Sequence, residues 1–208
     1  MNAFLIRTLV LGLALGFQLP QKTVWKPTRD IPLNGIAEMA YGHRSFMRLI
    51  AIYNRLDTME TAPKGTIIKT PPLPELFQDL GLLPRFQDQF DGIFHVIENF
   101  PGTIHDYQAL GRDQGFTDQE REEAHRLMIA KMNAYATKLE KAISELETLT
   151  ANGNTPKHML ERLKTAARSF RSWANQAYDP SLRQFKDMDF VQQQLARALA
   201  NAAAWSRE

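Results

Sequence analysis

The chain has 208 residues, of which 44% are hydrophobic and 23% are charged, with no cysteine and a formal net charge of +2. That apolar fraction is enough for a packed core in one or two domains and excludes a largely disordered protein. The lack of cysteine excludes disulfides, thiolate metal sites and cysteine nucleophiles, and the near-neutral charge argues against dedicated nucleic-acid binding.

Residues 1–21 are predicted to form a signal peptide. Arg7 precedes an apolar run from Leu9 to Phe17, and Pro20 ends any helix there. A run of about ten apolar residues is typical of a signal peptide and shorter than the roughly 20 residues that cross a bilayer. An N-terminal buried or amphipathic helix is the alternative. The leading interpretation predicts an exported protein of the periplasm or cell envelope of a bacterium, with no stable transmembrane span.

Residues 23–72 are predicted to form a strand, two short helices and a second strand. Thr23–Trp25 is a short β-rich run, and residues 32–41 and 45–53 carry apolar side chains at helical spacing. Gly65–Thr70 is again β-rich, and Pro71 ends it. This order predicts two short helices packed on a two-stranded sheet.

This segment resembles the lysin motif (LysM) family. The similar stretches are Asp30–Gly42 (DIPLNGIAEMAYG), Leu49–Asn54 (LIAIYN) and Gly65–Pro71 (GTIIKTP), which correspond to the family's first loop and helix, its second helix and its last strand. The resemblance implies a small α+β module of βααβ order over residues 22–72. It also implies binding of an N-acetylglucosamine-containing glycan, either peptidoglycan or a chitin-like polymer, in a shallow groove.

The resemblance further implies two walls for this groove, which we call the first and second wall segments. They comprise Asp30, Ile31, Pro32 and Leu33 in the first, and Thr58, Met59, Glu60 and Thr61 in the second. Loops of mixed polarity suit such a site, because backbone groups bond the acetamido groups and apolar atoms contact the methyl. The first wall segment departs from the family's pattern, since Asp30-Ile31-Pro32 replaces the usual Gly-Asp-Thr. A module that only scaffolds the chain is the alternative.

Residues 73–116 are predicted to form a linker with short helices. Pro71, Pro72 and Pro74 make a stiff connector. Helices are expected over residues 75–82 and 84–99, separated by Gly81 and Pro84. Residues 100–116 contain Pro101 and several glycines and are expected to be loop with little regular structure.

Residues 117–208 are predicted to form an antiparallel three-helix, coiled-coil-like bundle, which makes the chain mostly α overall. Thr117 and Glu120 have the spacing of a capping box, and Asn152-Gly153 and Asp179-Pro180 separate the helices. Apolar stripes are expected at Met128, Met132, Tyr135, Leu139, Ala142, Leu146 and Leu149, at Leu160, Leu163, Ala167, Phe170, Ala174 and Ala177, and at Met188, Val191, Leu195, Ala198, Ala202 and Trp205. Such a bundle contacts a protein partner or acts as a spacer, and a homodimer is a further option.

The titratable residues suggest no catalytic or metal site. Glu122 and His125 have the Glu-x-x-His spacing of di-iron bundles, but their position in a first helical turn favours solvated capping charges. His105-Asp106 lies in the expected loop without a nucleophile motif. We therefore expect no catalytic residues, no metal, no cofactor and no nucleic acid.

The leading interpretation is a non-catalytic envelope protein that binds peptidoglycan through the LysM-like module. The alternative is an envelope enzyme or enzyme regulator, in which that module only scaffolds or targets the chain. A cleft converging on His95, Glu98 and His105 would favour the alternative. An open groove between exposed wall segments would favour the glycan binder.

Overall fold

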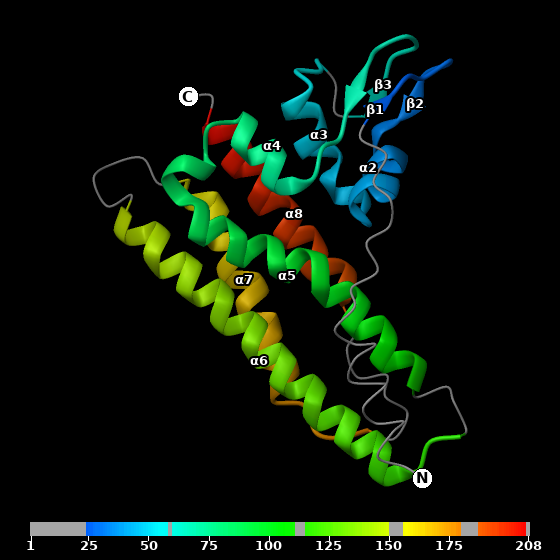
Figure 1. The fold of residues 1–208 in the computed structure, drawn as a ribbon, viewed down its shortest axis with the longest axis vertical. Coiled ribbons are helices and arrows are strands. Elements are labelled where there is room, and N and C mark those ends of the chain that lie inside the picture. Colours follow the sequence, from blue (N-terminus) through cyan, green and yellow to red (C-terminus); the bar gives the residue numbers. More distant parts are fainter. Residues whose placement is uncertain (1–23, 58–59, 111–114, 150–155, 180–186, 207–208) are drawn as a thin grey trace.

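A computed structural model describes residues 24–57, 60–110, 115–149, 156–179 and 187–206, and the described chain is mostly helical with two small strand pairs (Figure 1). This confirms the prediction of a mostly α protein with a small β component. Within those ranges, no helix combines the length and apolar character needed to cross a membrane. The predicted signal peptide over residues 1–21 lies outside the described residues.

The N-terminal module, defined here as residues 24–69, contains two short strand pairs and a helical layer. Strands β1 (Val24–Trp25) and β4 (Ile68–Lys69) pair antiparallel, as do β2 (Ile31–Pro32) and β3 (Thr61–Ala62). The helices between β2 and β3 are α2 (Leu33–Tyr41), the 3-10 turn η1 (Arg44–Phe46) and α3 (Met47–Tyr53). The predicted strand–helix–helix–strand order is therefore present, with β2 and β3 as an additional pair.

Periodic apolar residues explain the helices of the N-terminal module. Helix α2 buries Leu33, Ile36, Ala37 and Ala40 on one face, as expected for 3.6-residue periodicity. It ends at Gly42, whose left-handed φ of 73° favours glycine and lets its N–H bond the Glu38 carbonyl at 2.9 Å. Helix α3 buries Leu49, Ile50 and Ala51 against the same core.

The chain between the module and residue 117 differs from the prediction. Helix α4 (Leu73–Asp79) is followed by α5, a long helix from Leu83 to Leu110 with a kink at Phe86. The expectation of loop over residues 100–116 is wrong as far as Leu110. Pro101 removes one backbone hydrogen bond, but Phe100, Ile104 and Tyr107 continue the buried face of the helix. Burial of these side chains outweighs the local cost of proline.

The remaining helices begin and end close to the predicted positions. They are α6 (Asp118–Leu149), α7 (Lys157–Ala174) and α8 (Met188–Trp205). The capping box before α6 is confirmed, because the Thr117 N–H bonds Glu120 Oε2 at 2.8 Å and the Glu120 N–H bonds Thr117 Oγ1 at 3.3 Å. The predicted stripes are largely buried, although Leu149 is 54% exposed and Ala177 lies exposed beyond the end of α7.

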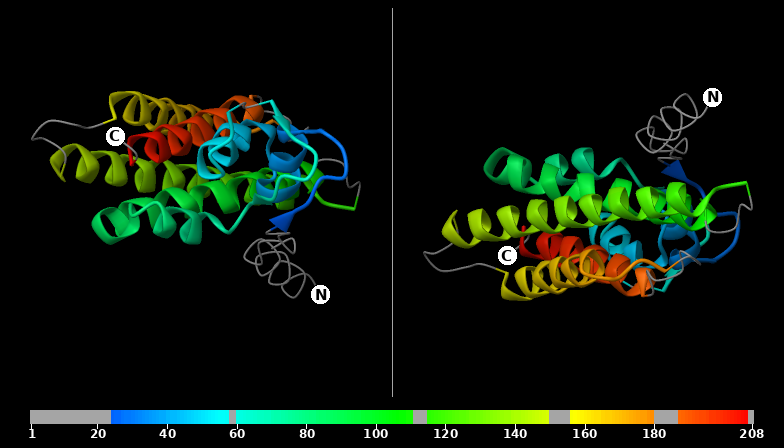
Figure 2. Two further views of the ribbon diagram at one scale, coloured as in Figure 1. Left: turned by 90° about the horizontal axis from the view of Figure 1, so that it is seen from above. Right: turned by 90° about the horizontal axis from the view of Figure 1, so that it is seen from below.

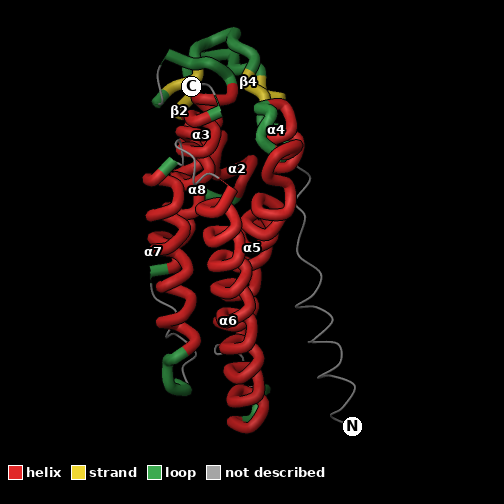
Figure 3. Tube along the Cα trace, turned by 90° about the vertical axis from the view of Figure 1, so that its left-hand side faces the viewer, coloured by secondary structure: helices red, strands yellow, loops and turns green. Residues whose placement is uncertain are grey.

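Four helices, not three, form the bundle of α5, α6, α7 and α8. Helix α5 packs along α6, α6 along α7 and α7 along α8, and α8 also contacts α5 (Figures 1 and 3). Successive helices run in opposite directions, as short connections require. The predicted linker over residues 73–116 therefore supplies a full helix to the bundle, because the buried face of α5 packs mainly against α6.

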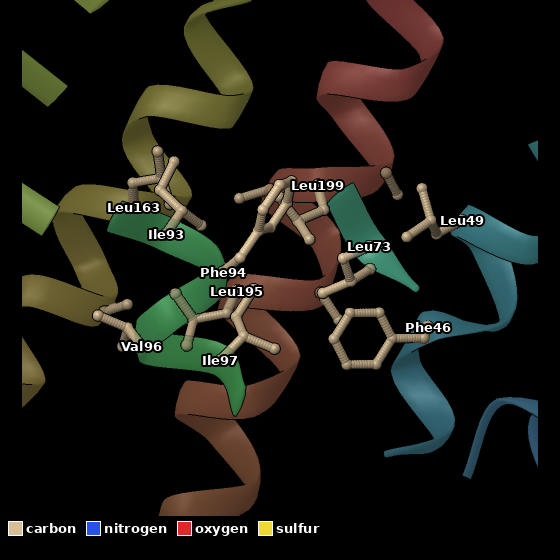
Figure 4. Packing of buried hydrophobic residues seen from close by; sticks show 14 of the residues in the cluster. Phe46, Leu49, Leu73, Ile93, Phe94, Val96, Ile97, Leu163, Leu195 and Leu199 are labelled. Atoms are coloured by element: carbon tan, nitrogen blue, oxygen red, sulfur yellow. The ribbon is translucent and has the colours of Figure 1, made fainter. Parts of the chain in front are cut away.

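The N-terminal module and the bundle share one hydrophobic core. Turn η1 and helix α3 pack on α8, and α4 packs on α5 (Figure 2). In Figure 4, Phe46 and Leu49 from the module point toward Leu199 of α8, with Leu73 of α4 beside them. Helix α8 is consequently buried on both sides. Its buried alanines, Ala196, Ala198, Ala200, Ala202 and Ala203, suit close approach of both neighbours.

Candidate functional site

The two predicted wall segments lie side by side at one edge of the N-terminal module. Ile31 and Pro32 pair with Ala62 and Thr61 in the β2–β3 ladder. The Leu33 N–H continues this contact by bonding the Glu60 carbonyl at 2.8 Å. Two segments about 30 positions apart in the sequence are thus joined directly, as part of one antiparallel edge.

The predicted site residues differ in their accessibility. Asp30, Pro32 and Glu60 are exposed, Ile31 and Thr61 are half-buried, and Leu33 is fully buried in the core. Thr58 and Met59 lie outside the described residues. A ligand at this edge would therefore contact Asp30, Pro32 and Glu60, whereas Leu33 anchors helix α2.

Where both wall segments are described, they are bonded to each other along one edge, which we call the ridge. The Asp30 carboxylate accepts the Lys64 N–H at 2.8 Å, and the Gly65 N–H bonds the Pro27 carbonyl at 2.9 Å. Together with the β2–β3 pairing, these bonds occupy backbone groups that an open groove would offer to a sugar. The six described residues of the wall segments lie together, and no open groove separates the paired parts. Their glycan-binding role stays a prediction.

Three side chains hold the β1–β4 sheet against the helices. Asn54 donates from Nδ2 to the carbonyls of Ile50 and Lys69 at 2.9 and 2.8 Å, and its Oδ1 accepts the Lys69 N–H at 2.7 Å. The Trp25 indole N–H donates to Thr70 Oγ1 at 2.9 Å. The Tyr41 hydroxyl donates to the Pro71 carbonyl at 2.7 Å, and burial raises the pKa of this hydroxyl strongly. Sequence reasoning noted Tyr41 and Asn54 as part of the resemblance but assigned them no role.

A histidine–aspartate contact joins the N-terminal module to the first turn of α8. His43 is 6% exposed, and its Nε2 lies 2.9 Å from Asp189 Oδ1. Its Nδ1 accepts the Ser45 N–H at 3.2 Å, so the proton of the neutral ring is on Nε2 and is donated to Asp189. This hydrogen bond, with Arg44 nearby, holds the pKa of the Asp189 carboxyl below its usual range. Local sequence patterns could not show this contact, because its partners are 146 positions apart.

Replacement of Asp189 by asparagine tests this contact through its pH dependence. Because folding lowers the Asp189 pKa, its stabilisation is present above the unfolded pKa of about 3.9 and is lost as the pH falls through the folded pKa. The carboxylate is 65% exposed, so solvent limits the loss to at most about 1 kcal/mol. We expect urea unfolding to separate the wild type from D189N at about pH 7 and not at about pH 2.5.

Asp91 provides the matched control for D189N. It is exposed on α5 and takes part in none of the ion pairs found in the described chain. D91N should unfold like the wild type at both pH values. A stability difference for D189N that persists at low pH would contradict the assignment.

The residues proposed for an enzymatic alternative do not converge. His95, Glu98 and His105 are all exposed on α5, and ten residues of helix separate His95 from His105 by about 15 Å. Partial burial, followed by Lys138, lowers the pKa of His95, and burial raises the pKa of Glu98. His95 and Glu98 lie about one helical turn apart, but His105 is too far along α5 to share a catalytic centre with them.

His125 is part of a buried hydrogen-bonded cluster rather than a solvated capping group. It is 8% exposed, its Nδ1 lies 2.9 Å from the Tyr107 hydroxyl and its Nε2 lies 3.2 Å from the Gln176 carbonyl. Both ring nitrogens thus contact protein groups, which corrects the expectation from the Glu-x-x-His spacing. In the described part of the chain, no cluster of three or more histidine, aspartate or glutamate side chains is placed to hold a metal ion.

A hollow of about 390 Å³ lies between helices α6 and α7. Its lining includes Ile143 together with two ion pairs, Glu140–Arg171 at 2.6 Å and Glu147–Lys164 at 2.9 Å. The two ion pairs join α6 to α7, and the exposed Arg168 adds a further positive charge to the lining.

Comparison with known proteins adds no template for any of these sites. No family model, no curated protein and no solved structure matches the chain. The wall segments, the His43–Asp189 contact and the buried His125 cluster are therefore defined by the geometry of this chain alone.

Proposed function

We propose that the protein binds an N-acetylglucosamine-containing glycan of the bacterial envelope, peptidoglycan first, through a LysM-like N-terminal module. The observation that supports this best is the order β1–α2–α3–β4 with β1 and β4 antiparallel, which is the βααβ arrangement that the resemblance implies. The adjacency of both wall segments at one edge supports it further.

The chemistry of the ridge is compatible with a sugar on its outer side. The carboxylates of Asp30 and Glu60 can accept hydrogen bonds from sugar hydroxyls, and the Pro32 ring gives an apolar surface for a sugar ring or acetamido methyl. Because the wall segments are bonded to each other, the glycan would lie along the ridge rather than between separated walls.

In this proposal the bundle carries the module. The four helices form a rigid support that spaces the ridge from a protein partner or from a second copy of the chain. The proposed place of action is the periplasm or cell envelope after export, and the proposed role is non-catalytic.

Sedimentation of the full chain with insoluble peptidoglycan and with chitin tests the proposal. We expect the wild type to sediment with at least one polymer. The double variant P32S/E60A should lose about tenfold in affinity, which corresponds to about 1.4 kcal/mol of ridge contacts. Serine suits the N-cap position that Pro32 occupies before α2, so this change preserves the helix.

Met39 supplies the control within the same module. It is 60% exposed on α2, and M39S should sediment like the wild type. Failure of the wild type to sediment with either polymer would end the glycan proposal. Sedimentation of P32S/E60A at wild-type affinity would remove the ridge as the site.

A further inference from the structure

The outer face of the β1–β4 sheet has an unusual composition for a solvent-exposed surface. The register pairs Val24 with Lys69 and Trp25 with Ile68. Because side chains alternate along each strand, Trp25 and Ile68 enter the core. The opposite face, which we call the outer sheet face, comprises Val24, Lys26, Ile67 and Lys69, all of them exposed.

The apolar members of the outer sheet face are unusually accessible. Val24 is 43% exposed and Ile67 is 54% exposed, which places both among the five large hydrophobic residues most exposed in the described chain. In the antiparallel register the two lie diagonally across the strand pair, with Lys69 opposite Val24. Two aliphatic side chains therefore alternate with two lysines on a single small surface.

The charge of this surface is uniformly positive. Over the residues that the structure describes, neither Lys26 nor Lys69 takes part in a side-chain ion pair. The two adjoining loops, which the Gly65–Pro27 hydrogen bond holds together, add exposed Arg29 and Lys64 and one acidic residue, Asp30, whose carboxylate accepts the Lys64 N–H. The face itself therefore has only positive charges, and the loops add a net positive charge to it, although the whole chain is nearly neutral.

We propose that the outer sheet face docks on the surface of a bilayer that contains anionic phospholipids. The lysine ammonium groups would contact lipid phosphates, and Val24 and Ile67 would enter the boundary between head groups and acyl chains. A soluble polyanion would engage the lysines and leave both aliphatic side chains in water. The alternation of aliphatic and cationic residues therefore favours a bilayer over a charged polymer.

The chain before Val24 gives a second reason to place this face near a membrane. Six residues separate Phe17, the last residue of the apolar run Leu9–Phe17, from Val24. The chain from Phe17 to Val24 spans at most about 25 Å when fully extended. While the predicted signal peptide is still attached, a membrane that holds the apolar run is therefore within reach of the outer sheet face. This docking uses other residues than the glycan ridge and does not depend on the proposed function.

Co-sedimentation of the full chain with lipid vesicles tests the proposal. One vesicle contains phosphatidylcholine alone, and the other contains phosphatidylcholine mixed with phosphatidylglycerol. We expect clear binding only to the anionic vesicles. Removal of two surface charges in K26Q/K69Q should lower the partition coefficient about 30-fold, and V24S/I67S should lower it about tenfold.

K138Q/K157Q is the matched control, because Lys138 and Lys157 are exposed on α6 and α7 and the net charge changes equally. This control should bind like the wild type, and equal melting temperatures will show that all variants are folded. Binding of K26Q/K69Q at wild-type strength would overturn the proposal and assign binding to another segment. Loss in K26Q/K69Q with full binding of V24S/I67S would also overturn it, in favour of a polyanion site.

Discussion

Replacing Phe46 by alanine is expected to lower the free energy of unfolding of the whole protein by about 3–5 kcal/mol. Phe46 is 2% exposed in turn η1, which packs on α8, and Figure 4 shows its ring at the junction of the N-terminal module with the bundle. The lost ring would leave a cavity between the two parts. The melting temperature should fall by roughly 10 °C.

Two optical signals measure whether F46A destabilises both the N-terminal module and the bundle. Helix content by circular dichroism reports mainly on the bundle, whereas tryptophan fluorescence includes Trp25 of the N-terminal module. Both transitions should shift together in F46A, because one core connects the parts. The exposed Met39 gives the control, and M39S should change stability by less than about 0.5 kcal/mol. A bundle transition that stays at its wild-type midpoint in F46A would show two independent domains.

Replacing Phe90 by alanine is expected to cost a similar amount, about 3–5 kcal/mol. The Phe90 ring is fully buried in α5, with ring centroids 4.7 Å from Phe77, 5.9 Å from Phe94 and 6.5 Å from Phe86. This cluster joins α4 to α5. Contacts between offset and edge-on rings add to the apolar area that the ring buries.

Comparing the urea unfolding of F90A with that of H105A tests whether α5 is a helix of the bundle or part of a linker. His105 lies on the same helix with an exposed side chain, so H105A should differ from the wild type by less than about 0.5 kcal/mol. If residues 73–116 contributed little to folding, F90A and H105A would unfold alike. That result would contradict the packing of α5 in the bundle.

The elements that sequence patterns predicted well have local signals. Helix α6 begins at the capping box of Thr117 and Glu120 and ends within one residue of the expected position. Helix α2 ends at Gly42, where a left-handed backbone favours glycine. Such signals depend on a few neighbouring residues, so they can be interpreted without knowing the tertiary contacts.

The second half of α5 was predicted wrongly because its helix-breaking residues and its pattern of buried residues point to different structures. Pro101 and Gly102 are poor helix formers, and they favoured a loop. The spacing of Phe100, Ile104 and Tyr107 was the signal in favour of helix, and their burial decided the outcome. A similar signal was present in α8, where Leu199 and Ala203 lie off the predicted stripe and widen the apolar surface. That width indicated a second neighbour, which is the N-terminal module.

The wall segments illustrate what a resemblance supplies and what it leaves open. It grouped eight residues that the structure does bring to one edge, apart from Thr58 and Met59, which are not described. It did not indicate the pairing of Ile31 with Ala62, because strands of two residues have no recognisable pattern. The outer sheet face was likewise absent from the sequence interpretation, since it depends on the register of β1 and β4.

The double-sided burial of α8 has a consequence for the order of folding on the ribosome. Residues 188–205 are synthesised after every other described helix, yet they lie between the N-terminal module and the rest of the bundle. Until residues 188–205 have been synthesised, Phe46 and Leu49 lack the helix that covers them, so the growing chain exposes this apolar surface. The final native contacts connect very distant positions, which slows folding. A chaperone that holds the growing chain would therefore act on the N-terminal module first and release it when α8 arrives.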